Sequence, residues 1–202
     1  MYKRNHNSQF SILIISICIL VTCIVVSCNK HDHNKNIFHY NESSGIATLD
    51  PTFAKSQSVM WVDHQLYNTL VETDDNLNMV PSLAKSWDIS ADNLTFTFHL
   101  RNDVFFHDNP AFVNEKGRLM KAKDVEYSFK RITDKSVASS GAWIFNDKID
   151  STEGFKAIDD TTFQLKLLKP FNPILGILSM QYCSVVPHEV VEKYGKDFRN
   201  HP

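Results

Sequence analysis

The sequence predicts a mixed fold of helices and strands. Two segments, 94–101 and 163–168, alternate between apolar and polar residues, as half-buried strands do. Two others, 58–70 and 122–132, place apolar residues three and four positions apart, as amphipathic helices do. Turn-forming residues separate these segments along the 202-residue chain. Together they indicate an α+β layer.

The composition is that of a globular protein. Hydrophobic residues make up 43% and charged residues 22% of the chain, which excludes disorder of the whole. Lys and Arg number 21 against 23 Asp and Glu, a balance that does not suit binding to a phosphate backbone. We therefore expect no nucleic-acid partner, and after the N-terminal region no span is apolar and long enough to cross a bilayer.

The N-terminus has the layout of a secretory signal. Lys3 and Arg4 precede the apolar stretch 10–26, and the chain becomes polar at Asn29. The length of that stretch suits either a signal core or a short membrane anchor. The tetrad 25–28, VVSC, resembles a bacterial lipobox, so we predict a lipoprotein signal peptide at 1–27 and lipid on Cys28. The alternative is an uncleaved anchor helix, and both place the remainder outside the cytoplasm, because positive charge stays inside.

Cleavage after residue 27 would determine which cysteines remain and which segment precedes the domain. Residues 28–36 contain nothing to bury and predict a flexible tether between lipid and domain. Cys18 and Cys23 leave with the signal and Cys28 takes the lipid, so only Cys183 remains. We predict no internal disulfide and a buried, hydrophobe-like role for Cys183.

The first elements are expected as follows. A strand is predicted at 37–40, a turn at 43–45 and a break in the chain at 49–51. A helix follows from Ser58, and Asp63 falls off its apolar stripe. The stripe consists of Val59, Val62, Leu66 and Leu70.

Next, Pro81 suits the first turn of a short helix within 80–85. Strand 94–101 directs one face inward and pairs, through a turn at 91–93, with a strand at 87–89. The inward face carries Leu94, Phe96, Phe98 and Leu100.

In the second half, Asp124 suits the first turn of the helix 122–132 through the helix dipole. A loop at 136–141 precedes the strand that carries Phe163, Leu165 and Leu167. A short helix from Pro173 to Met180 and a helix at 187–194, ended by Gly195, complete the expected elements.

Motifs of catalysis and cofactor binding are missing from the sequence. There is no Gly-rich phosphate loop, nucleophile elbow, H-E-x-x-H or C-x-x-C, so we expect neither an enzyme nor a bound cofactor. His31, Asp32, His33 and His39 are the richest metal-like cluster, but they lie in or next to the tether, where nothing fixes ligand geometry. We therefore predict no metal site.

Two aromatic residues stand out because of their place in the chain. Trp143 and Phe145 follow the flexible stretch 139–141, where exposed aromatic side chains would need a reason to exist. That reason is either contact with a ligand or a plug that covers the core.

Six blocks of sequence, taken in order, carry a family resemblance. They are Ser44–Pro51 (SGIATLDP), Leu66–Val71 (LYNTLV), Pro81–Trp87 (PSLAKSW), Phe96–Arg101 (FTFHLR), Val104–Asp108 (VFFHD) and Ala122–Phe129 (AKDVEYSF). From Ile37 to Pro202 the chain resembles family 5 extracellular solute-binding proteins, the dipeptide, oligopeptide and nickel receptors of ABC importers. The blocks LAKSW and TFxLRxxVxxHD are highly specific in combination.

The resemblance implies a periplasmic-binding-protein-like fold of the class II type. It further implies an N-terminal fragment, with the start of the main lobe at 37–70, an accessory subdomain at 71–184 and a truncated return segment at 185–202. By resemblance, the whole protein is a substrate-binding lipoprotein. It captures di- or oligopeptides between two lobes and delivers them to a membrane permease and its ATPase. The alternative is a stand-alone surface lipoprotein module without a transport function.

The resemblance also assigns candidate binding residues. The segment that matches the cleft-lining loop after the first strand consists of Ser44, Gly45, Ile46, Ala47 and Thr48, and Gly45 would allow a ligand to approach the backbone closely. Trp143 and Phe145 match the region where the subdomain reaches toward the cleft. Residues that pair with the charged ends of a peptide belong, by resemblance, to the second lobe.

Overall fold

The computed structural model describes residues 39–150 and 152–202. The chain separates after Asn41 into two units, and all described helices and strands belong to the second, Glu42–Pro202. The predicted signal peptide, tether and Cys28 lie outside the described residues, as do the first two residues of the strand predicted at 37–40; His39 and Tyr40 have irregular backbone. Within the described ranges, no helix combines the length and the apolar character that a bilayer crossing requires.

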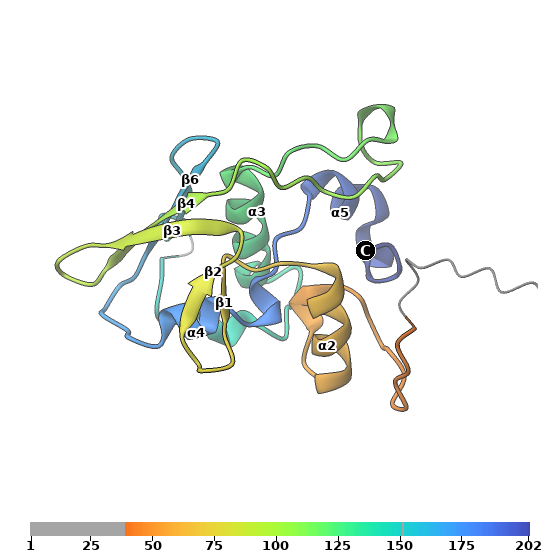
Figure 1. The fold of residues 1–202 in the computed structure, drawn as a ribbon, viewed down its shortest axis with the longest axis horizontal. Helices are drawn as coiled ribbons and strands as arrows, with labels where there is room; N and C mark the ends of the chain where they lie inside the picture. The colour runs from red at the N-terminus through yellow and green to blue at the C-terminus, as the bar shows by residue number, and fades with distance from the viewer. Residues whose placement is uncertain (1–38, 151) are drawn as a thin grey trace, which may run out of the picture. The chain divides into compact units, whose positions relative to one another are not determined.

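The larger sheet among the described residues has four antiparallel strands and lies to the left of α3 (Ala122–Thr133) in Figure 1. Its strand order is β3 (Ala84–Ile89), β4 (Thr95–Leu100), β6 (Thr162–Lys166) and β5 (Phe155–Ala157). The β3–β4 hairpin is the one predicted from the turn at 91–93. Strand β4 then pairs with β6, which is more than sixty residues away in the sequence. The intervening chain contains α3, which packs against β5 and β6.

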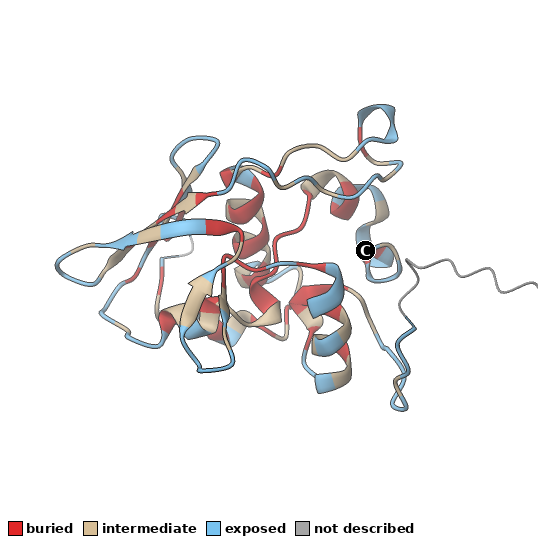
Figure 2. Ribbon diagram, in the orientation of Figure 1, coloured by how far each residue is buried: buried red, intermediate tan, exposed pale blue. Residues whose placement is uncertain are grey.

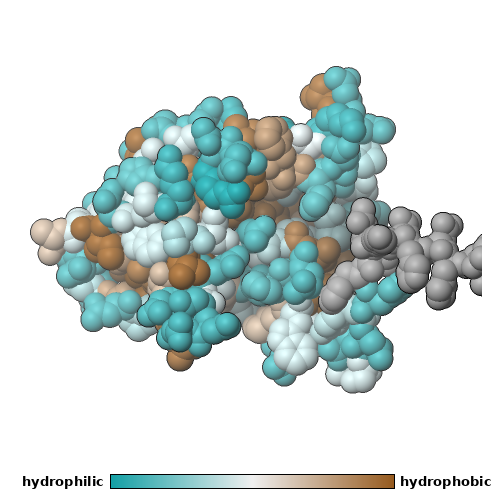
Figure 3. Space-filling view, viewed as in Figure 1, coloured by the Kyte–Doolittle hydropathy of each residue, from teal (hydrophilic) through white to brown (hydrophobic). Residues whose placement is uncertain are grey.

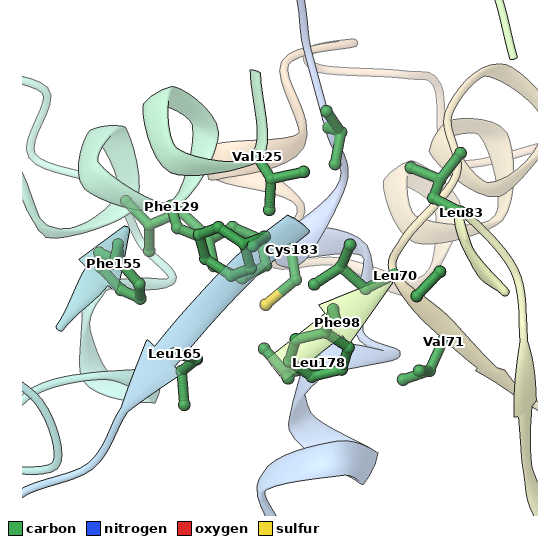
Figure 4. Packing of buried hydrophobic residues seen from close by; sticks show 14 of the residues in the cluster. Leu70, Val71, Leu83, Phe98, Val125, Phe129, Phe155, Leu165, Leu178 and Cys183 are labelled. Carbon is green, nitrogen blue, oxygen red and sulfur yellow. The ribbon is translucent and has the colours of Figure 1, made fainter. Parts of the chain in front are cut away.

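The main hydrophobic core lies between α3 and the sheet (Figures 2 and 4). Phe98 of β4 and Phe163 of β6 are cross-strand partners, and both are fully buried. The ring of Phe129 on α3 has its centroid 5.5 Å from those of Phe155 and Phe163, at edge-to-face angles. The inward faces predicted from alternation in β4 and β6 are therefore confirmed.

A small hairpin precedes the sheet. Strands β1 (Val71–Thr73) and β2 (Met79–Pro81) pair antiparallel. The helix predicted within 80–85 is wrong, because Pro81 ends a strand there. As an exposed end residue, Pro81 loses little by lacking an amide hydrogen. The next three amides, of Ser82, Leu83 and Ala84, donate to the carbonyls of Thr69 and Leu70 instead of forming a helical turn.

Helix α2 (Gln57–Leu66) forms as predicted but faces the core differently. Val59 is buried, whereas Leu66 is exposed and Leu70 lies beyond the helix end. Asp63, four residues after Val59 and predicted to lie off the stripe, is fully buried. The stripe prediction is therefore wrong at Leu66 and Asp63, because the helix places the row Val59–Asp63 inward, whereas Val59 and Leu70 are buried as predicted.

The remaining elements are short. They are the helices α4 (Ile174–Leu178) and α5 (His188–Tyr194) and the 3-10 turns η1 (Pro51–Phe53), η2 (Val113–Glu115), η3 (Ala142–Ile144), η4 (Gln181–Cys183) and η5 (Gly195–Asn200). Helices α4 and α5 confirm the predictions, and Gly195 ends α5 with a positive φ of 53°. Cys183 is fully buried, which raises the pKa of its thiol and confirms its role as a core residue.

Candidate functional site

The segment Ser44–Thr48 lies at the surface. Residues 44–47 are exposed and Thr48 is half-buried. The predicted turn forms at Ser43 and Ser44, and the Ser44 amide donates to the Glu42 carboxylate. Gly45 has a φ of +68° and open space where a Cβ would lie, so the backbone can be approached closely there. None of the amides from Gly45 to Thr48 donates a hydrogen bond to a described residue.

The chain is fixed immediately after this segment by a buried ion pair. The two terminal nitrogens of Arg131 donate to the two carboxylate oxygens of Asp50, at 2.8 and 2.5 Å. The side chains of Arg131 and Asp50 are 10% and 5% exposed. The same carboxylate accepts hydrogen bonds from the amide and the hydroxyl of Thr52. Asp50 is thereby held to α3 through Arg131, which is the residue before the buried Ile132.

Two backbone contacts fix the neighbouring Leu49. The Tyr67 hydroxyl donates to the Leu49 carbonyl at 2.9 Å, and the Leu49 amide donates to the Arg199 carbonyl at 2.8 Å. The guanidinium of Arg131 also lies 5.5 Å from the centre of the Phe198 ring, within range of a cation–π interaction. The residues directly after the segment, Leu49 to Thr52, therefore form a base that is fixed to α3, to the end of α2 and to η5.

A cavity of about 830 Å³ opens beside this base. Thr48 and Asp50 line one side, and residues of α3, including Tyr127 and Lys130, line another. Helix α5 and the η5 turn contribute Glu192 and further residues. The face seen in Figure 3 is mainly hydrophilic, with separate hydrophobic patches.

The two predicted aromatic residues lie in different environments. The side chain of Phe145 is 1% exposed, and its ring centroid is 4.9 Å from that of Phe155, so it belongs to the core. A side chain buried in this way offers no surface to a ligand, which favours the plug interpretation for Phe145. Trp143 is 53% exposed. The loop before it is joined to the base of the segment, because Ser139 donates to the Thr52 carbonyl at 2.7 Å.

Sequence reasoning missed a buried carboxyl group next to this base. Neither oxygen of Asp63 has a hydrogen-bond partner among the described residues. Burial, and secondly the charge of Asp50, raises the pKa of Asp63 to about 7. Burial also raises the pKa of Tyr67, and the charges of Asp63 and Asp50 add to the shift. The three groups therefore interact electrostatically. The position of Asp63 one helical turn after Val59 was the available signal.

A second polar centre also escaped the sequence analysis. The oxygen and nitrogen atoms of Asp124, His188 and Glu189 come within 4.8 Å of one another, close enough to hold a metal ion. The guanidinium of Arg118 already binds this group, with hydrogen bonds to both carboxylates. Asp124 also accepts the Lys121 amide hydrogen, which confirms its role in the first turn of α3. The centre is therefore an ion-pair network around arginine.

Comparison with known proteins then decides the family. Residues 78–202 match the family described as bacterial extracellular solute-binding proteins, family 5 Middle. The chain belongs to this family. The resemblance inferred from the sequence blocks is thus confirmed.

Two curated relatives show the extent of the match. The dipeptide-binding protein of Escherichia coli (strain K12) is 34% identical over 135 residues, covering 63% of this chain and 25% of the relative. The dipeptide-binding protein of Lactococcus lactis subsp. cremoris (strain MG1363) is 32% identical over 181 residues, covering 84% of this chain and 31% of the relative. These relatives are binding proteins and not enzymes.

Solved structures agree with the fold. The periplasmic binding protein DppA from Helicobacter pylori, in complex with the peptide STSA, superposes with a TM-score of 0.66 and 28% identity, covering 77% of this chain and 32% of that one. The fold is accordingly that of part of a periplasmic peptide-binding protein. The chain spans about a quarter to a third of the length of these relatives.

Proposed function

We propose that this chain belongs to the substrate-binding protein of a peptide ABC importer, which captures di- or oligopeptides and delivers them to a membrane permease and its ATPase. The observation that carries the proposal is the segment Ser44–Thr48, exposed at residues 44–47, in which the amides of residues 45–48 donate to no described residue and which is joined to a fixed base. Unpaired amides at the surface can bind the main chain of a peptide, which gives affinity with little sequence preference. The two relatives are dipeptide-binding proteins, which supports the same class of ligand.

In this proposal the chain supplies one wall of a two-walled cleft. The division proposed is 37–70 for the start of the main lobe, 71–184 for the accessory subdomain and 185–202 for the return segment. Trp143 is retained as a candidate contact because it is exposed, and Phe145 is left out because its ring is in the core. A second lobe supplies the other wall and the groups that pair with the ends of the peptide, and contacts made only in the closed state select that state.

Peptide binding tests the proposal directly. We expect the chain, fused to the second lobe of a dipeptide-binding relative, to retain peptides from a mixture, with mass spectrometry to identify them. Calorimetry with a retained peptide should give much weaker binding for the chain alone, because one wall supplies only part of the contacts. Equal affinities would contradict the two-walled cleft, and no retention by either protein would favour the stand-alone module.

A pair of glycines provides a matched control for the segment. A Cβ added at Gly45 or at Gly176 would have open space, but only Gly45 has a positive φ. Gly45→Ala should therefore strain the segment by about 1 kcal/mol and weaken peptide binding by the fused protein, whereas Gly176→Ala should not weaken it. Equal affinities of the two variants would show that the conformation at Gly45 is not needed.

We also propose that Cys28 carries lipid and holds the protein on the outer side of a bacterial membrane. Expression with a labelled fatty acid should label the chain and the Cys23→Ser control but not Cys28→Ser, because the thiol at 28 is the acylation site. An unlabelled, membrane-bound chain that retains residues 1–27 would support the anchor helix instead.

A further inference from the structure

We propose that Arg131 is a positioning residue, which sets the direction in which the segment Ser44–Thr48 leaves the folded domain. The inference rests on the proposed function only where it concerns peptide affinity. Arg131 donates hydrogen bonds to Asp50 and Thr52 at the base and to no residue of the segment itself. Its effect on a peptide bound along the segment would therefore be transmitted through the backbone.

The contact between Arg131 and Asp50 defines an orientation as well as a position. Two parallel hydrogen bonds, at 2.8 and 2.5 Å, align the plane of the carboxylate with the plane of the guanidinium. One guanidinium nitrogen also donates to the Thr52 hydroxyl at 3.1 Å. A lysine ammonium could keep the charge but not this paired geometry.

The partner of this contact is rigidly held. Arg131 lies on α3 between Lys130 and the fully buried Ile132, and Phe129 on the same helix is at the centre of the aromatic core. Fixing Asp50 to α3 therefore ties the segment to the most buried helix of the unit. The contacts at Leu49 are single hydrogen bonds, which leave rotation possible.

Between Asp50 and the turn at Ser43–Ser44, few contacts hold the chain. The Asp50 amide donates to the Thr48 hydroxyl at 3.0 Å, and the Ser44 amide donates to Glu42. The direction of the chain at Asp50 consequently determines where the free amides of residues 45–48 lie. An ion pair this deeply buried adds little stability compared with apolar residues, which favours a role in fixing geometry.

Hydrogen exchange in the full chain, purified in detergent, tests the positioning role. We expect Arg131→Lys and Asp50→Asn to increase exchange of the amides of Leu49, Asp50 and Thr52 by at least about tenfold, because each variant breaks the paired contact. Exchange in β4 and β6 should stay at the wild-type rate. Arg101→Lys is the matched control, because Arg101 makes a similar paired contact with Asp103 at the exposed surface.

Three outcomes would overturn the inference. The first is unchanged exchange at 49–52 in both variants. The second is an equal increase in β4 and β6, which would show a purely structural role. The third is unchanged affinity of the variants fused to a second lobe, if the wild-type fusion binds peptide. Exchange is measured without peptide, so a wild-type fusion that binds none would count against the proposed function and not against the positioning role.

Discussion

Replacing Arg118 by alanine is expected to lower the free energy of unfolding by about 3–5 kcal/mol. Arg118 donates to both oxygens of Asp124, at 2.8 and 2.6 Å, and to both oxygens of Glu189, at 2.5 and 2.8 Å. The Asp124 side chain is 2% exposed, so the variant would leave a buried charge without its main partner. The guanidinium also lies 5.3 Å from the ring centre of Phe106 and 5.9 Å from that of Phe112, and these contacts would be lost as well.

The size of the effect follows from the position of Arg118. It joins the loop before α3 to the N-terminus of α3 and to the start of α5. The loop and the start of α5 are about seventy residues apart in the sequence. Urea denaturation of the wild type, Arg118→Ala and Arg101→Ala measures the difference. Arg101 pairs with Asp103 at the exposed surface, where water screens the pair, so its loss should change the free energy of unfolding far less than the loss of Arg118. Similar costs for the two variants would contradict the assignment of Arg118 as the buried centre.

The second large effect is a loss of stability as pH rises, caused by Asp63. The pKa of Asp63 is raised from 3.8 to about 7 in the folded chain. Between these values the unfolded chain has lost the proton while the folded chain keeps it, so stability falls as pH increases. Above about pH 7 the cost is complete and is on the order of 4 kcal/mol, because each pKa unit corresponds to about 1.4 kcal/mol.

Asp63→Asn should remove this pH dependence. The variant should be more stable than the wild type at pH 8, because a neutral amide replaces a buried charge, and close to it at pH 4, where the wild-type carboxyl is mostly protonated when folded. Asp75→Asn, a surface carboxylate, is the matched control and should leave the pH profile unchanged. Thermal unfolding at pH 4, 6 and 8 measures the profiles, and parallel curves for wild type and Asp63→Asn would show that Asp63 is not the responsible group.

Several features could be predicted from local sequence. Alternation at 94–101 was sufficient to place Phe96, Phe98 and Leu100 on the buried face of β4. The periodicity at 122–132 predicted α3 and its inward residues, and Gly195 marked the end of α5. In each case the signal lies within one element, because side-chain directions repeat with a fixed period along a helix or a strand. The sequence blocks also indicated the family, which the comparison confirmed.

The candidate site was predicted only in part. The turn followed from residues 43–45, because Ser and Gly favour turns, whereas the positive φ of Gly45 came from the structure. Nothing in the local pattern indicated that Asp50 would bind Arg131, because the two residues are 81 positions apart. The core position of Phe145 could not be read from its loop either, since it depends on Phe129 and Phe155 meeting it in space.

The sequence by itself determined the types of the longer elements, the buried faces of β4, β6 and α3, and the family of this protein. Only the tertiary structure decided that β4 pairs with β6, that Asp63 is turned inward and that Arg131 and Arg118 bind the carboxylates they do. The physical reason is that the spacing of apolar residues indicates which side of an element avoids water. The choice of partner depends on chain closure and on the packing of segments that are distant in sequence.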